Sequence, residues 1–189
     1  MLGLLAKISD ESLMSKYQQG DSSSFEKLYA RHKDPLFAYL YRSHVDLSAI
    51  EEIAQETWVA IIDSAKNYRA SAKFKTYLYS IAHRKLVDFW RKNKFDYLLD
   101  RTDGSGESIM ENIADNRSSS TDSIDLSMDL LLALESLSKE QQQAFLLRGE
   151  GFTRREIAVM TDTNEETIKS RIRYASTHLK RILEVQYAD

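Results

Sequence analysis

The chain has 189 residues, a net charge of −3 and 42% hydrophobic residues, which is enough for one large or two small domains. It contains no cysteine, so disulfides, thiolate metal sites and cysteine nucleophiles are excluded, and its four histidines show no metal-ligand spacing. No apolar run is long enough to span a membrane and the N-terminus lacks a signal-peptide pattern, so we expect a cytoplasmic protein without membrane insertion. One proline and six glycines favour an all-helical fold.

Residues 1–97 are expected to form the first helical domain. A short helix is predicted to end at Gly20, and Asp21 is a suitable N-cap for the next helix. Asp34 followed by Pro35 has the pattern of an N-cap with proline at the first helical position, so the chain is expected to restart or kink there.

A long helix with apolar residues at helical spacing is then predicted to begin at Ser48. One of its faces carries Glu52, Gln55 and Glu56 at positions i, i+3 and i+4. Taken by themselves, these three residues are best explained as a solvated acidic face.

The helix predicted from Phe74 to about Lys92 has two apolar faces. One has the spacing of a core stripe, whereas the other carries aromatic residues among cations and includes Tyr79, His83, Trp90, Arg84, Arg91 and Lys92. Aromatic rings among cations suit single-stranded nucleic acid, because bases stack on the rings while the cations hold phosphates. The alternative, equally compatible with the spacing, is that the rings are core residues.

Charge is distributed unevenly along the chain. Residues 1–97 carry 15 basic and 12 acidic residues, residues 98–125 carry 2 and 7, and residues 126–189 carry 9 and 10. The middle segment is acidic and rich in serine and glycine, so it is predicted to be a flexible linker. Clusters of basic residues on both sides of it indicate two places that hold a polyanion.

Residues 126–189 are expected to form a second domain that ends in a helix-turn-helix. Ser138 with Gln141 is predicted to cap one helix. Two short helices joined by a tight turn then follow, and their predicted capping boxes are Thr153 with Glu156 and Thr163 with Glu166. The cations of the second helix are Lys169, Arg171 and Arg173. A helix of this kind can enter the major groove of DNA, although an ordinary helical hairpin with a solvated basic face has the same pattern.

Several segments, in this order, resemble the extracytoplasmic-function group of bacterial RNA polymerase sigma factors. They are residues 24–29 (SFEKLY), 49–58 (AIEEIAQETW), 74–83 (FKTYLYSIAH) with 88–91 (DFWR), and 134–137 (LESL) with 151–171. No single motif is specific, but together they cover nearly the whole chain outside the linker.

The resemblance implies a transcription initiation factor of two helical domains. Residues 1–97 would bind core RNA polymerase and recognise and melt the −10 element (region 2), and residues 126–189 would recognise the −35 element (region 4). The implied polymerase-binding residues are Glu52, Gln55 and Glu56. The implied −10 residues are Tyr77, Tyr79, His83, Arg84, Asp88, Trp90, Arg91 and Lys92. The implied −35 residues are Arg154, Arg155, Glu165, Thr167, Lys169, Ser170, Arg171 and Arg173.

The resemblance also implies an anti-sigma partner and a linker that reaches between promoter elements. The 28 residues 98–125 extend to at most about 90 Å. Elements some 17 base pairs apart lie roughly 55–60 Å from each other. Some positions depart from the family pattern: Tyr77 stands where tryptophan is usual and Arg84 where asparagine is usual, so contacts near the −10 element are expected to differ.

Two other classes of protein remain open at this point. A stand-alone helix-turn-helix regulator would need only the second domain, and a structural interaction protein would ignore DNA. Enzyme activity has no support, because the sequence offers neither a phosphate loop nor a nucleophile with a paired base. We therefore expect no catalytic residue, metal or cofactor.

Overall fold

The computed structural model describes residues 8–43, 45–69, 73–100 and 130–186, and all regular structure in these ranges is helical. This confirms the predicted fold class. The first domain contains α1 (Asp10–Gln18), α2 (Ser22–Tyr41), α3 (Leu47–Ser64), the 3₁₀ turn η1 (Ala65–Asn67) and α4 (Phe74–Asp100). The second contains helical residues 130–135, followed by α6 (Lys139–Gly149), α7 (Arg154–Met160) and α8 (Glu165–Gln186).

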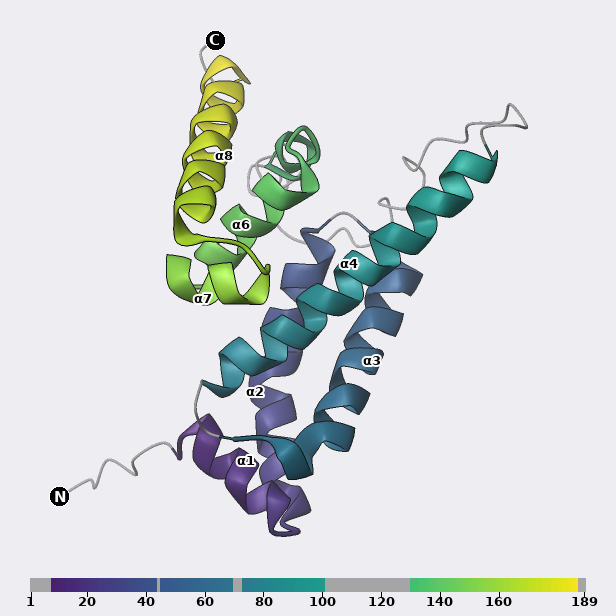
Figure 1. The fold of residues 1–189 in the computed structure, drawn as a ribbon, viewed down its shortest axis with the longest axis vertical. Coiled ribbons are helices and arrows are strands. Elements are labelled where there is room, and N and C mark those ends of the chain that lie inside the picture. Colours follow the sequence, from purple (N-terminus) through teal and green to yellow (C-terminus); the bar gives the residue numbers. More distant parts are fainter. Residues whose placement is uncertain (1–7, 44, 70–72, 101–129, 187–189) are drawn as a thin grey trace, which may run out of the picture.

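Helix α4 lies between the two groups of helices. It crosses the molecule diagonally, with α2 and α3 packed against it from the first domain and α7 from the second (Figure 1). Because both domains cover it, α4 is apolar on two faces: Leu78 and Ala82 are fully buried on one, and Tyr79 and Leu86 are fully buried on the other.

The predicted start of α2 and end of α1 are confirmed. The Asp21 carboxylate accepts a hydrogen bond of 3.1 Å from the Ser23 backbone N–H, as an N-cap does. Gly20 has a φ of +100°, and the Asp21 N–H donates to the Lys16 carbonyl. This is a Schellman turn, whose left-handed residue is most often glycine.

In the first domain, the predicted restart at Pro35 and the predicted helix start at Ser48 are wrong, and the alternative of a kink at Pro35 stays a prediction. Helix α2 does not restart at Pro35 but continues through it, because Leu36, Tyr39 and Leu40 extend its buried stripe beyond the proline. Helix α3 begins at Leu47, one residue before Ser48, because Asp46 is its N-cap and accepts a hydrogen bond of 2.8 Å from the Ala49 N–H.

Helix α4 continues to Asp100, so its last three residues, 98–100, lie in the segment that was expected to begin the linker. The rest of the predicted linker, residues 101–125, lies outside the described residues.

In the second domain, two predicted capping boxes are confirmed and one is wrong. The boxes Ser138 with Gln141 and Thr153 with Glu156 start α6 and α7. Helix α8, however, begins after Asn164, whose side-chain oxygen accepts a hydrogen bond of 2.8 Å from the Thr167 N–H. The pattern of threonine with glutamate was therefore misplaced by one residue, because asparagine competes successfully for the same capping position.

The turn between α7 and α8 is a Schellman turn without glycine. The Thr163 N–H donates to the Ala158 carbonyl at 3.0 Å, and Asp162 occupies the left-handed position with a φ of +49°. Ile157 and Ile168 are fully buried behind this turn. The turn and this apolar contact together fix α8 relative to α7.

The N-cap assignment can be tested by mutation. We expect Asn164→Ala to lower the free energy of unfolding by about 0.5–2 kcal/mol, because it leaves the first N–H groups of α8 without their acceptor. Thr163→Ala, the matched control, should change it by less than about 0.5 kcal/mol. Urea unfolding followed by circular dichroism measures both, and equal losses in the two variants would contradict the assignment.

Candidate functional site

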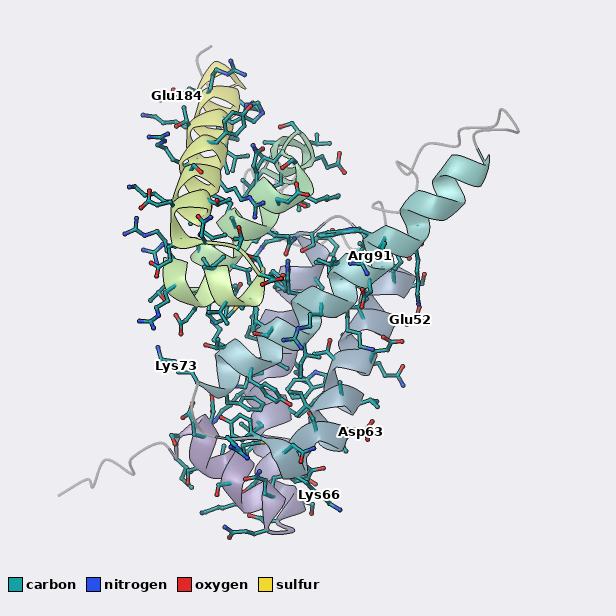
Figure 2. The ribbon with its side chains drawn as sticks, viewed as in Figure 1. Glu52, Asp63, Lys66, Lys73, Arg91 and Glu184 are labelled. Carbon is teal, nitrogen blue, oxygen red and sulfur yellow. The ribbon has the colours of Figure 1, made fainter. Side chains whose placement is uncertain are left out.

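The acidic face of α3 is exposed as a unit. Glu52, Gln55 and Glu56 all lie at the surface, and Glu56 forms an ion pair of 2.8 Å with Lys85 of α4. Figure 2 shows Glu52 directed away from the helices. The sequence did not indicate that this face also exposes apolar groups: Val59 is 49% and Ile62 is 43% exposed. An exposed mixture of carboxylates and aliphatic side chains is suited to contact with a protein.

The predicted −35 residues lie on α7 and on the first half of α8. Arg154 and Arg155 occupy the exposed first turn of α7. Exposed residues on α8 are Glu165, Lys169, Ser170 and Arg173, whereas Thr167 and Arg171 are half-buried. The spacing of four residues between Glu165, Lys169 and Arg173 places them on one side of the helix.

Lys169 and Arg171 differ in their surroundings. Lys169 forms an exposed ion pair of 3.2 Å with Glu166, which costs little to break. Arg171 lines a shallow groove with Gln141, Arg173 and Tyr174.

The polar residues of the predicted −10 set are exposed, namely Arg84, Asp88, Arg91 and Lys92. Asp88 and Arg91 form an exposed ion pair of 3.2 Å. Tyr77 is half-buried, and its hydroxyl lies 2.5 Å from the Ser64 hydroxyl. Its ring centroid lies 5.2 Å from that of Tyr68.

The aromatic residues of the same set are covered by the second domain. Tyr79 is fully buried, with its ring centroid 5.0 Å from that of Phe152, and His83 is 8% exposed. Trp90 is half-buried, and the Lys139 ammonium at the start of α6 lies 5.2 Å from the centroid of its ring. In this structure the second face of α4 is therefore an interface between domains.

Glu150, at the end of α6, is the centre of this interface. Its carboxylate accepts a hydrogen bond of 3.0 Å from the Tyr79 hydroxyl and lies 3.6 Å from the Arg42 guanidinium. The Lys75 ammonium lies 3.5 Å from the same carboxylate and donates to the Glu150 backbone carbonyl at 2.6 Å. Three side chains of the first domain therefore converge on one residue of the second.

A second polar cluster lies beside it. The Tyr39 hydroxyl donates to the Gln143 side-chain oxygen at 2.5 Å, and the Gln143 amide donates to the Ser43 hydroxyl at 2.9 Å. Gln142 is also buried, and its amide donates to the Arg42 carbonyl at 3.3 Å. Sequence reasoning missed these residues, because two adjacent glutamines in a helix are usually exposed.

The electrostatics of the interface keep both tyrosines as donors. Burial raises the pKa of Tyr39, and the neighbouring Tyr79 and Glu150 raise it further. The pKa of Tyr79 is raised by burial and by Glu150. Burial also lowers the pKa of His83, which favours the neutral ring.

Within the described ranges, no three potential ligands cluster as a metal site would require. No helix there has the combined length and hydropathy needed to cross a membrane.

Two family models match the chain, Sigma-70 region 2 over residues 28–95 and Sigma-70 region 4 over residues 127–179. The sequence is 31% identical to the extracytoplasmic-function (ECF) RNA polymerase sigma factor SigW of Bacillus subtilis, in an alignment that covers 46% of each chain. It is 24% identical to the ECF RNA polymerase sigma-E factor of Haemophilus influenzae over 88% of this chain and 90% of that one.

Two solved structures share the fold. CnrH, determined in complex with the cytosolic domain of CnrY, matches with a TM-score of 0.69 and 18% identity over 94% of this chain and 99% of that one. The sigma factor RpoE of Bartonella quintana, determined in complex with the anti-sigma factor NepR, matches with a TM-score of 0.69 and 23% identity over 85% and 97%. With regions 2 and 4 present in order and sequence relatives that span most of its length, this chain belongs to the ECF group of RNA polymerase sigma factors.

Proposed function

We propose that this sigma factor directs core RNA polymerase to promoters by reading the −35 duplex with α8 and holding the −10 strand with α4. The observation that carries the proposal is the exposed basic first half of α8, set against α7 by a fixed turn. A helix-turn-helix presents its second helix to the major groove in this way. The chain itself would perform no covalent chemistry, because the polymerase is the catalyst.

The proposed polymerase contact is the exposed face of α3. Glu52, Gln55 and Glu56 supply charge and hydrogen-bonding groups, and Val59 and Ile62 supply apolar area that is otherwise left in water. Burial of such aliphatic groups favours association by roughly 25 cal/mol for each Å² removed from water.

For the −10 element we propose that the non-template strand follows the cations of α4 and that its bases stack on the aromatic face. Arg84, Arg91 and Lys92 are exposed and available to phosphates. Stacking contributes about 1–3 kcal/mol per base, against a cost of a few kcal/mol for unstacking. Tyr79 and Trp90 can contribute only after the second domain moves away.

We also propose that the chain has an anti-sigma partner. The two solved relatives named above were determined with such a protein or with a cytosolic partner domain, and they share this fold.

The whole proposal can be tested by adding the protein to core polymerase and measuring run-off transcription from a promoter library. We expect selective initiation that depends on the protein. A stand-alone regulator would instead bind duplex DNA tightly without polymerase and would support no initiation.

The docking face is tested by the double variant Gln55→Ala with Glu56→Ala. We expect loss of core-polymerase binding in a pull-down, with a melting temperature close to wild type, because exposed polar changes and exposed ion pairs affect stability little. Glu26→Ala, which removes an exposed carboxylate from α2, should bind normally. Wild-type affinity in the double variant would show that another face docks.

The −35 contacts are tested by comparing Arg171→Ala with Lys169→Ala in the holoenzyme. If Arg171 is bidentate to a guanine, its loss should cost about 1–3 kcal/mol and relax the choice of base at one position. Loss of Lys169 should weaken binding to all sequences alike. It should also reduce by about one the steepness with which the logarithm of the binding constant falls against the logarithm of salt concentration. Binding titrations on duplexes with single-base changes separate the two, and uniform losses for both variants would leave only backbone contacts.

Strand capture is tested with Trp90→Ala, because this ring is half-buried whereas Tyr79 is fully buried. We expect slower promoter opening with unchanged polymerase and −35 binding, and partial recovery on a template whose −10 region is already unpaired. Replacement of Tyr79 by alanine would instead lower the free energy of unfolding by about 3–5 kcal/mol, because the ring is buried, and this loss of stability would obscure the result. Equal defects on paired and unpaired templates would argue against stacking on Trp90.

A further inference from the structure

The interface between the two domains covers one functional surface and leaves the others open. It buries Tyr79 and His83 and partly covers Trp90, all on the second face of α4. The acidic face of α3 and the exposed −35 residues of α7 and α8 stay accessible. The covered surface is the one proposed above to hold the −10 strand.

The contact between the two domains resembles a transient protein interface in its polar composition. Its centre is polar, with Glu150 and Gln143 in contact with five side chains of the first domain. Contacts between domains of one chain resemble transient protein interfaces in this respect, and relative motion of the domains is expected unless the contact is large and hydrophobic.

Buried polar atoms without a hydrogen-bond partner also favour an interface that opens. Among the described residues, the buried side-chain atoms without a hydrogen-bond partner are His83 Nδ1, Trp90 Nε1 and Gln142 Oε1. All three side chains belong to helices of this interface, α4 and α6. Permanent cores leave few such atoms because each costs about 1–3 kcal/mol. Separation of the domains would return these atoms to solvent or to a ligand.

We propose that Glu150 and Gln143 form a latch with which the second domain covers the strand-binding face of α4 in the free protein. Glu150 holds Tyr79 and Lys75, and Gln143 holds Tyr39 and Ser43. The identity of the competing ligand, a single DNA strand, rests on the proposed function, whereas the latch itself rests on these contacts.

Geometry gives the latch a consequence for promoter binding. With α7 packed against α4, the −35 and −10 surfaces lie side by side (Figure 1). Promoter elements some 17 base pairs apart lie roughly 55–60 Å from each other on duplex DNA. The latched chain therefore cannot engage both elements, and release of the second domain must precede or accompany promoter binding.

The test uses the full chain and two variants of the second domain, Glu150→Gln and Gln143→Ala, alone and combined. Glu184→Gln is the matched control, because it removes a carboxylate at the far end of α8, away from α4 (Figure 2). The chain lacks cysteine, so Asp63→Cys and Arg181→Cys accept a pair of dyes or spin labels, and their separation reports the arrangement of the domains. Both positions are exposed.

We expect one narrow separation in the wild type and in Glu184→Gln, and a broader, longer distribution in the combined latch variant. Fluorescence anisotropy with a labelled −10 non-template oligonucleotide should then show affinity raised about tenfold, because the apparent dissociation constant falls as the competent fraction rises. An unchanged distance distribution in a folded combined variant would overturn the latch.

Failure of the proposed function gives a different result. If the distance increases but no variant binds the strand, the latch stands and strand capture by α4 is wrong. If the wild type and the opened variant bind the strand equally tightly, the second domain does not compete for that face and the proposal of a covering latch fails. Far-ultraviolet circular dichroism of each variant checks that the helices are retained.

Discussion

A buried tyrosine hydroxyl needs an acceptor, and this requirement connects the two halves of the molecule. The Tyr79 ring lies in the interior, where an unpaired hydroxyl would cost a few kcal/mol, and the acceptor comes from Glu150 of the other domain. Glu150 in turn needs neighbouring positive charge in that setting, which Lys75 and Arg42 provide. The desolvation of one hydroxyl and one carboxylate thus contributes to the position of the second domain on α4.

The sequence of α4 showed that the helix has two apolar faces but did not decide what the second face does. Its two apolar faces were visible in the spacing of its residues, and they required either burial on both sides or a functional aromatic surface. The structure buries both sides, but the second side is covered by a separate domain through polar contacts. The two explanations are therefore compatible, if the domain that covers the rings in one state leaves them in another.

The parts of the fold that were predictable are those set by local chemistry. Capping boxes at Ser138 and Thr153 and the glycine turn at Gly20 need only neighbours in the sequence, and they are present. The errors arose where two local signals compete, as at Asn164, or where tertiary packing overrides one, as at Pro35. Gln143 could not have been assigned, because its partners lie 100 or more residues away. The candidate surfaces on α3 and α8 were found through their motifs, and their roles stay predictions.

The left-handed aspartate in the turn between α7 and α8 limits how this region can change during evolution. Asp162 adopts a φ of +49°, which aspartate, asparagine and glycine tolerate far better than other residues do. A β-branched residue at this position would force the turn to another geometry and rotate α8 against α7. Neutral drift at position 162 should consequently be confined to a few residue types, whereas exposed Val159 in the preceding helix, at 74% exposure, is free of that constraint. A turn outside the proposed set of DNA contacts would in this way restrict the sequences available to the helix that follows it.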